Sequence, residues 1–88
     1  MESKINGTQL VITLDNDLVA SYLDEQLNST KAILKENPDA KEVVLDMQNV
    51  NEIDSLGINL VVGIYKQVAG EKKKFKTTNV SKPIKNLF

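Results

Sequence analysis

Three side chains in this sequence have the types and spacing to take part in chemistry: Asp46, Asp54 and Ser55. Two carboxylates near a hydroxyl suit acid–base catalysis, Mg²⁺ binding, or a serine that is itself modified. The chain contains no His, Cys, Trp or Arg. This removes the commonest general base, the thiolate nucleophile, and the cation that clamps phosphate with two hydrogen bonds. No base is paired with a nucleophile and no glycine-rich phosphate loop is present, so we expect no enzymatic activity, no cofactor and no metal site.

A short buried strand is predicted over residues 42–46, because its centre is an apolar run of two valines and a leucine. Asp46 ends this strand, and an irregular loop follows over residues 47–54. We expect Asp46 to accept hydrogen bonds from loop amides and so to fix the loop that presents Ser55.

Ser55 lies at the start of a second apolar stretch, which predicts a helix over residues 56–69 with Gly70 just past its end. The unpaired N–H groups and positive dipole of a first helical turn favour an anion, so a phosphate on Ser55 would be accommodated. Gly57 would leave the backbone uncovered, which would let a kinase or phosphatase approach. On spacing alone, the alternative is that Ser55 is only the N-cap, with Asp54 a second capping acid and Gly57 a packing residue.

This second helix is apolar on almost every side. The face expected against the sheet consists of Leu60, Val61, Ile64 and Val68, and the apolar residues left for other sides are Ile58, Val62 and Tyr65. Contact with a partner and partial cover by a later helix both explain the surplus, and the sequence leaves the two open.

A hairpin and a helix precede these elements. The pair Asn6-Gly7 predicts a type I′ turn that pairs residues 2–5 antiparallel with a strand over 9–14. That strand is almost continuously apolar, which is typical of a strand covered on both faces. The oxygens of Asp15-Asn16-Asp17 predict a cap for a helix from Leu18 to about residue 36.

The rest of the chain predicts a third main strand over 74–79 and a last helix capped by Ser81, with an apolar stripe of Ile84, Leu87 and Phe88. Strands alternating with helices imply crossover connections. The expected fold class is therefore α/β: one domain with a mixed sheet, mainly parallel with one antiparallel N-terminal strand, and helices packed on it.

The stretch from Val44 to Gly57 resembles the signature of the STAS domain family, which includes bacterial anti-sigma factor antagonists and cytoplasmic domains of sulfate transporters. In that signature, a strand ends in Asp, a short loop carries apolar anchors, and Asp-Ser/Thr-x-Gly opens a helix. The matching positions are Asp46, Val50, Ile53, Asp54, Ser55 and Gly57. The order of elements also agrees over nearly the whole chain. STAS domains usually continue further past the start of the last helix, so we expect residues 1–88 to form a single STAS domain short of the full C-terminal helix.

The resemblance implies an anti-sigma factor antagonist that sequesters an anti-sigma serine kinase while Ser55 is unphosphorylated, with a phosphatase to reset it. The partner-binding residues it implies are Asp15, Asp17, Asp54, Ser55, Leu56, Gly57 and Ile58. The alternative is a non-switching STAS subunit of a transporter or a larger signalling assembly. A second copy of the chain is a further candidate partner.

The charge is uneven along the chain: residues 1–65 carry 11 acids and 4 lysines, whereas residues 66–88 carry 7 lysines and one acid. The basic end lacks arginine and has few aromatic residues for base stacking, so we expect a solvated face and no nucleic-acid partner. No apolar run is long enough for a membrane span and no signal peptide is visible. We therefore expect a cytoplasmic protein without membrane insertion.

Overall fold

The structure, a computed structural model, describes residues 1–85. Its sheet has the strand order β1-β2-β3-β4, formed by β1 (Glu2–Asn6), β2 (Gln9–Thr13), β3 (Glu42–Asp46) and β4 (Lys74–Thr78). β1 is antiparallel to β2, and the other two pairs are parallel. The helices are α1 (Ala20–Glu36), α2 (Ser55–Gly70) and the short α3 (Lys82–Lys85). The predicted α/β fold with one antiparallel N-terminal strand is confirmed.

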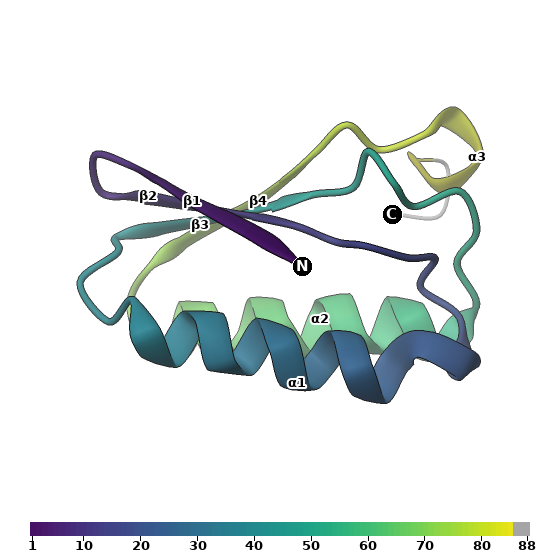
Figure 1. The fold of residues 1–88 in the computed structure, drawn as a ribbon, viewed down its shortest axis with the longest axis horizontal. Helices are drawn as coiled ribbons and strands as arrows, with labels where there is room; N and C mark the ends of the chain where they lie inside the picture. The colour runs from purple at the N-terminus through teal and green to yellow at the C-terminus, as the bar shows by residue number, and fades with distance from the viewer. Residues whose placement is uncertain (86–88) are drawn as a thin grey trace.

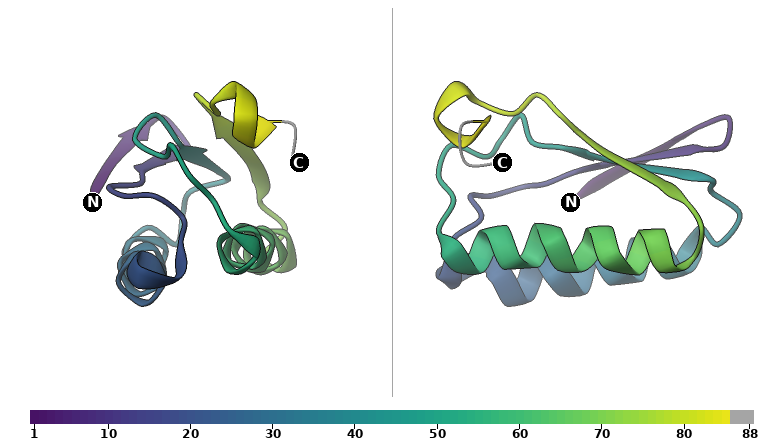
Figure 2. Two further views of the ribbon diagram at one scale, coloured as in Figure 1. Left: turned by 90° about the vertical axis from the view of Figure 1, so that its right-hand side faces the viewer. Right: turned by 180° about the vertical axis from the view of Figure 1, so that it is seen from behind.

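Both long helices lie on the same face of the sheet, as Figures 1 and 2 show. The strands β2, β3 and β4 lie side by side in chain order, so the two crossover connections run across the sheet in the same direction. Because parallel crossovers are right-handed, both helices then lie on one side of the sheet. Along β2, buried residues therefore alternate with half-buried ones. The expectation that β2 is covered on both faces was wrong. Helices lie on both faces of a parallel sheet only where the order of its strands reverses, and this sheet has no such reversal.

The core lies between the sheet and the two long helices. From α2 it takes Leu60, Val61, Ile64 and Val68, the face predicted from the sequence. From α1 it takes Leu34, and the polar residues Gln26 and Thr30 are buried beside it. Ile84 is buried in the same core, whereas Leu87 and Phe88, the other members of the predicted stripe, lie outside the described residues.

Three local predictions differ from the structure. Asn6 pairs with Gln9, so the hairpin loop is Gly7-Thr8 with only Gly7 at positive φ, which matches the φ pattern of a type II′ turn. Gly70 is still helical, and Lys72 is the residue with positive φ after α2. The buried Ser81 hydroxyl makes no hydrogen bond within residues 1–85, so it does not cap α3.

Candidate functional site

Ser55 is the first residue of α2, and Asp54 is its N-cap. The Asp54 Oδ1 atom accepts a 2.8 Å hydrogen bond from the Gly57 N–H, which satisfies one of the free donors of the first turn. The Ser55 side chain is exposed, and its hydroxyl makes no hydrogen bond to the residues that the structure describes. The alternative that Ser55 is the N-cap is therefore wrong. The serine follows the cap, and its hydroxyl makes no hydrogen bond within the described residues.

The carboxylate of Asp54 also reaches the other long helix. Its Oδ2 atom accepts a 3.0 Å hydrogen bond from the N–H of Ala20, the first residue of α1. The backbone hydrogen bonds from Gly57 and Ala20 favour the charged form and lower the pKa of Asp54 below its ordinary value of 3.8. One ionised carboxylate thus ties together the N-termini of α1 and α2.

Asp17 holds the loop before Ser55. Its Oδ1 atom accepts hydrogen bonds from the N–H groups of Asn51 at 2.7 Å and Glu52 at 3.1 Å. The residue before α1 is Val19, which makes no side-chain cap, so the expectation that residues 15–17 cap this helix was wrong. Asp17, which was expected to cap the helix that follows it, instead fixes a loop more than thirty residues away.

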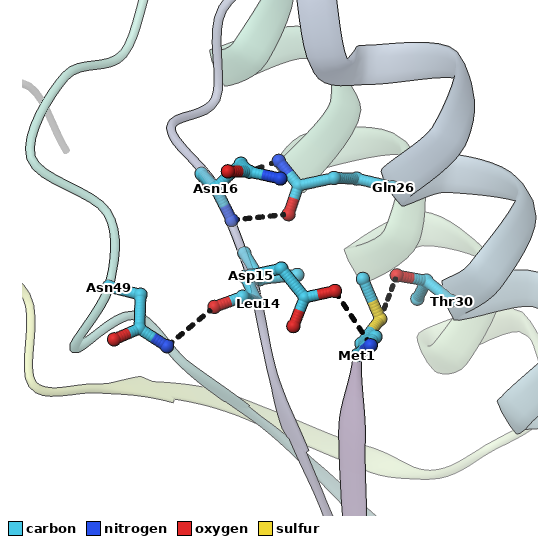
Figure 3. Close-up of polar contacts among 7 residues, drawn as sticks. All are labelled: Met1, Leu14, Asp15, Asn16, Gln26, Thr30 and Asn49. Carbon is cyan, nitrogen blue, oxygen red and sulfur yellow. Dashed lines mark hydrogen bonds and ion pairs between the residues drawn. The ribbon is translucent and has the colours of Figure 1, made fainter.

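Gln26 anchors the segment that carries Asp17, a role that the sequence analysis missed. It is only 2% exposed, and its Nε2 atom donates to the carbonyls of Asn16 at 3.1 Å and Asp17 at 2.9 Å. Figure 3 shows this side chain reaching from α1 to the Asn16 backbone. The sequence did contain a signal for this role: Gln26 is a polar residue on the inward face of an amphipathic helix, and buried polar groups need hydrogen-bond partners.

Asp15 and Asp46 lie further from Ser55 in the hydrogen-bond network. Asp15 pairs with the amino group of Met1 at 2.6 Å (Figure 3). Asp46 accepts from the Gln48 N–H at 3.1 Å and from the Asn79 side chain at 2.9 Å, so it joins the ends of β3 and β4. Asp46 does hold a loop amide, but only at the start of the loop, and the end next to Ser55 is held by Asp17.

Gly57 is buried against the backbone of α1's leading loop. A Cβ atom at this position would overlap the carbonyl oxygen of Leu18. That oxygen accepts a 3.1 Å hydrogen bond from the Asp54 N–H. The expectation that Gly57 leaves its backbone uncovered was wrong, because Leu18 covers it, and Gly57 is the packing residue of the alternative interpretation. Its contact with a partner stays a prediction. Its neighbours differ: Leu56 is 52% exposed and Ile58 is half-buried.

The site therefore unites two loops and two helix starts around Ser55. Within residues 1–85, no three acidic side chains gather as a metal site would require. Among the same residues, no helix is both long and apolar enough to cross a bilayer. What the arrangement offers is an exposed hydroxyl beside an ionised carboxylate, with an exposed leucine next to it.

Comparison with known proteins gave one family model, the STAS domain, which matches residues 1–88. No curated protein matches the sequence. The solved structures that resemble the fold include the anti-sigma factor antagonist SpoIIAA in its unphosphorylated form, with a TM-score of 0.71 and 17% identity, over 99% of this chain and 79% of that one. The protein TM1081 matches with a TM-score of 0.76 and 17% identity, over 97% of this chain and 67% of that one.

A third similar structure is that of Mglu, with a TM-score of 0.73 and 14% identity. The match covers 92% of this chain but spans only 20% of the Mglu chain. At these identities the likeness shows a shared fold.

Proposed function

The chain belongs to the STAS domain family, and from that premise we propose that it is an anti-sigma factor antagonist switched by phosphorylation of Ser55. With Ser55 unmodified it binds an anti-sigma serine kinase, which frees the sigma factor for transcription. Once Ser55 carries a phosphate the complex separates, and a phosphatase restores the binding form. The likeness to the antagonist SpoIIAA supports this choice within the family.

The observation that carries the proposal is that Asp54, and not Ser55, caps α2. Asp54 performs the capping, so the Ser55 hydroxyl is exposed and free of structural hydrogen bonds among the described residues. A phosphate there would add about 1.5 to 2 negative charges at neutral pH. Because no native bond has to break, the charge changes the docking surface and leaves the fold intact.

The docking surface of this proposal surrounds Ser55. Its apolar centre is the exposed Leu56 with the half-buried Ile58, and its acids are Asp15, Asp17 and Asp54. An acidic rim around an apolar centre fits a basic partner surface. Phosphorylation would place further negative charge at the middle of this contact, where desolvation makes charge most costly.

STAS domains are typically non-enzymatic binding modules, and this chain supplies the hydroxyl while its kinase supplies the ATP chemistry. We assign it to the cytoplasm, where such a kinase and a sigma factor act. A homodimer through the exposed side of α2 remains compatible with this role.

The switch is tested with candidate anti-sigma serine kinases. Incubation with ATP is followed by intact mass and peptide mapping, and modification at a residue other than Ser55 refutes the site. In a pull-down, Ser55→Ala stays bound after ATP is added and Ser55→Asp loses binding. Ser3→Asp, an exposed serine on β1, is the matched control and keeps its binding. Equal binding by the two Ser55 variants would end the proposal.

A second candidate is a non-switching STAS module within a transporter or a larger signalling assembly. The match to only 20% of the Mglu chain favours it, since this fold also occurs as a small part of longer chains. This candidate predicts no phosphorylation of Ser55 and a gene neighbourhood with a transporter in place of a kinase and a sigma factor.

A further inference from the structure

β1 is an edge strand, and its hairpin determines which of its backbone groups point outward. In the part of the chain that the structure describes, its only neighbour in the sheet is β2, and it lies on the α1 side of the molecule, away from β4 (Figure 2). Asn6 and Gln9 flank the Gly7-Thr8 loop, and in such a hairpin the flanking pair exchanges both of its hydrogen bonds. Bonded and outward residues alternate along an antiparallel pair, so the N–H and C=O groups of Ser3 and Ile5 point away from β2.

The side chains of β1 leave this edge accessible. All five residues of the strand are exposed, and the strand has no proline and no bulge in its pairing with β2. Ile5 is 50% exposed although it pairs with the core residue Leu10 and so faces the helix layer. A regular exposed edge is a template for another strand, and only its charged side chains then decide which strand it accepts.

The charged side chains of β1 are Glu2 and Lys4, and both lie on the face of the sheet opposite the helices. They pair with Thr13 and Val11 and alternate with Ile5 along the strand. Within residues 1–85, neither of them makes an ion pair. An acid and a base at alternate positions on one face are self-complementary, because an antiparallel second copy sets its lysine opposite the acid and its acid opposite the lysine.

The charges select one register for two antiparallel β1 strands. Outward residues must face outward residues, so Ser3 lies opposite Met1, Ser3, Ile5 or Gly7 of the second copy. Opposite Met1 it brings Glu2 against Glu2, and opposite Ile5 it brings Lys4 against Lys4, and like charges directly opposite are destabilising. Opposite Gly7 the pairing runs into the turn and contains no ion pair. Only the Ser3–Ser3 register pairs every Glu2 with a Lys4.

We propose that two copies of the chain associate through β1 about a twofold axis at Ser3, which joins their sheets into one. The Ser3 N–H of each copy donates to the Ser3 carbonyl of the other, and the Ile5 N–H donates to the Met1 carbonyl. On the open face of the sheet, Glu2 and Lys4 form reciprocal ion pairs. On the helix face, Ile5 lies opposite Met1, which packs against the core. Two five-residue strands form a small contact, so we expect a Kd on the order of 100 μM.

This contact is separate from the proposed switch, since Ser55 and Leu56 lie on α2. Ser55→Asp therefore leaves the Kd of the dimer unchanged. Ser3→Asp does the reverse, because it sets two carboxylates opposite each other at the twofold axis. It raises the Kd of the dimer about fivefold, whereas binding of the kinase continues. Failure of the dimer is thus distinguishable from failure of the switch.

Charge reversal tests the register, with sedimentation of the full chain as the measurement. Lys4→Glu sets an acid opposite Glu2 in both halves of the contact, and the Kd is expected to rise about tenfold at low salt. The double variant Glu2→Lys, Lys4→Glu exchanges the two charges, restores both ion pairs and returns the Kd to that of the wild type. Lys31→Glu, an exposed lysine of α1, is the charge control and leaves the Kd unchanged.

Hydrogen exchange locates the contact on the strand. As the protein concentration rises, exchange at the Ser3 and Ile5 amides should slow, because these groups become bonded to the second copy. The Glu2 and Lys4 amides bond to β2 in the single copy, so their exchange rates should stay the same.

Three results would overturn the proposal. The first is a single monomeric species in sedimentation up to about 1 mM. The second is a Lys4→Glu variant that dimerises as the wild type does, or a double variant that does not recover, since either would show that these charges do not set the register. The third is protection of the Ser3 and Ile5 amides that does not depend on concentration, which would show that the edge is already covered in the single copy.

Discussion

Asp54 and Ala20 lie 34 residues apart in the chain and are joined by a 3.0 Å hydrogen bond from the Ala20 N–H to the Asp54 carboxylate. The other oxygen of the same carboxylate caps α2 through Gly57. One side chain therefore stabilises the start of both long helices. Ser55 is released from any capping role, and this is what makes its hydroxyl available.

The first prediction concerns acid stability. The pKa of Asp54 is lowered in the folded state, so its ionised form stabilises the fold at neutral pH, and this contribution is lost as the pH falls below 3.8. Wild type should therefore be more stable than Asp54→Asn at pH 7, and the gap should narrow steadily toward pH 2.5. Urea unfolding of both proteins across this range measures the gap. Asp39→Asn, at an exposed turn, controls for loss of one negative charge. A gap that stays constant with pH would contradict the assignment.

The second prediction compares two glycines of α2. In Gly57→Ala, the new methyl group overlaps the Leu18 carbonyl, so the two chain segments must separate, and we expect a loss of about 2–3 kcal/mol. In Gly63→Ala, the methyl group meets nothing within 4 Å, so the better helix former should add about 1 kcal/mol. Chemical denaturation gives both values. A neutral Gly57→Ala would show that Leu18 does not press against this turn.

The third prediction concerns Gln26. Replacing it with leucine keeps the volume but leaves the partly buried carbonyls of Asn16 and Asp17 without donors, which we expect to cost about 1–3 kcal/mol. Loosening of this segment should also speed hydrogen exchange at Asn51 and Glu52, whose N–H groups bond to Asp17. Gln67→Leu, an exposed glutamine of α2, serves as the control. Unchanged exchange at both amides would show that Gln26 does not hold the loop.

The sequence predicted the elements whose pattern is local. The apolar run of β3 and the spacing of Leu60, Ile64 and Val68 are read directly from neighbouring residues, and both predictions are confirmed. The same holds for the antiparallel first strand, although its turn lies one residue later than Asn6-Gly7 suggested.

What the sequence could not supply is the pairing of side chains with distant backbone groups. Asp17 and Asp54 both looked like caps for the helix that follows each of them, which is the most frequent use of such residues. Only the fold shows that Asp17 bonds to Asn51 and that Asp54 also bonds to Ala20. The burial of Gly57 has the same origin, since it depends on where Leu18 lies.

The last prediction separates capping from switching at Ser55. Because its hydroxyl makes no hydrogen bond among the described residues, Ser55→Ala should change the free energy of unfolding by less than about 0.5 kcal/mol. A serine that capped the helix would lose about 1 kcal/mol. In Ser55→Asp, the helix dipole favours the new charge and the ionised Asp54 opposes it, so the fold should again be nearly unaffected. Urea unfolding of the three proteins makes the comparison. If Ser55→Asp unfolds easily, its loss of partner binding says nothing about a switch; if it stays folded and still fails to bind, the added charge acts on the docking surface itself.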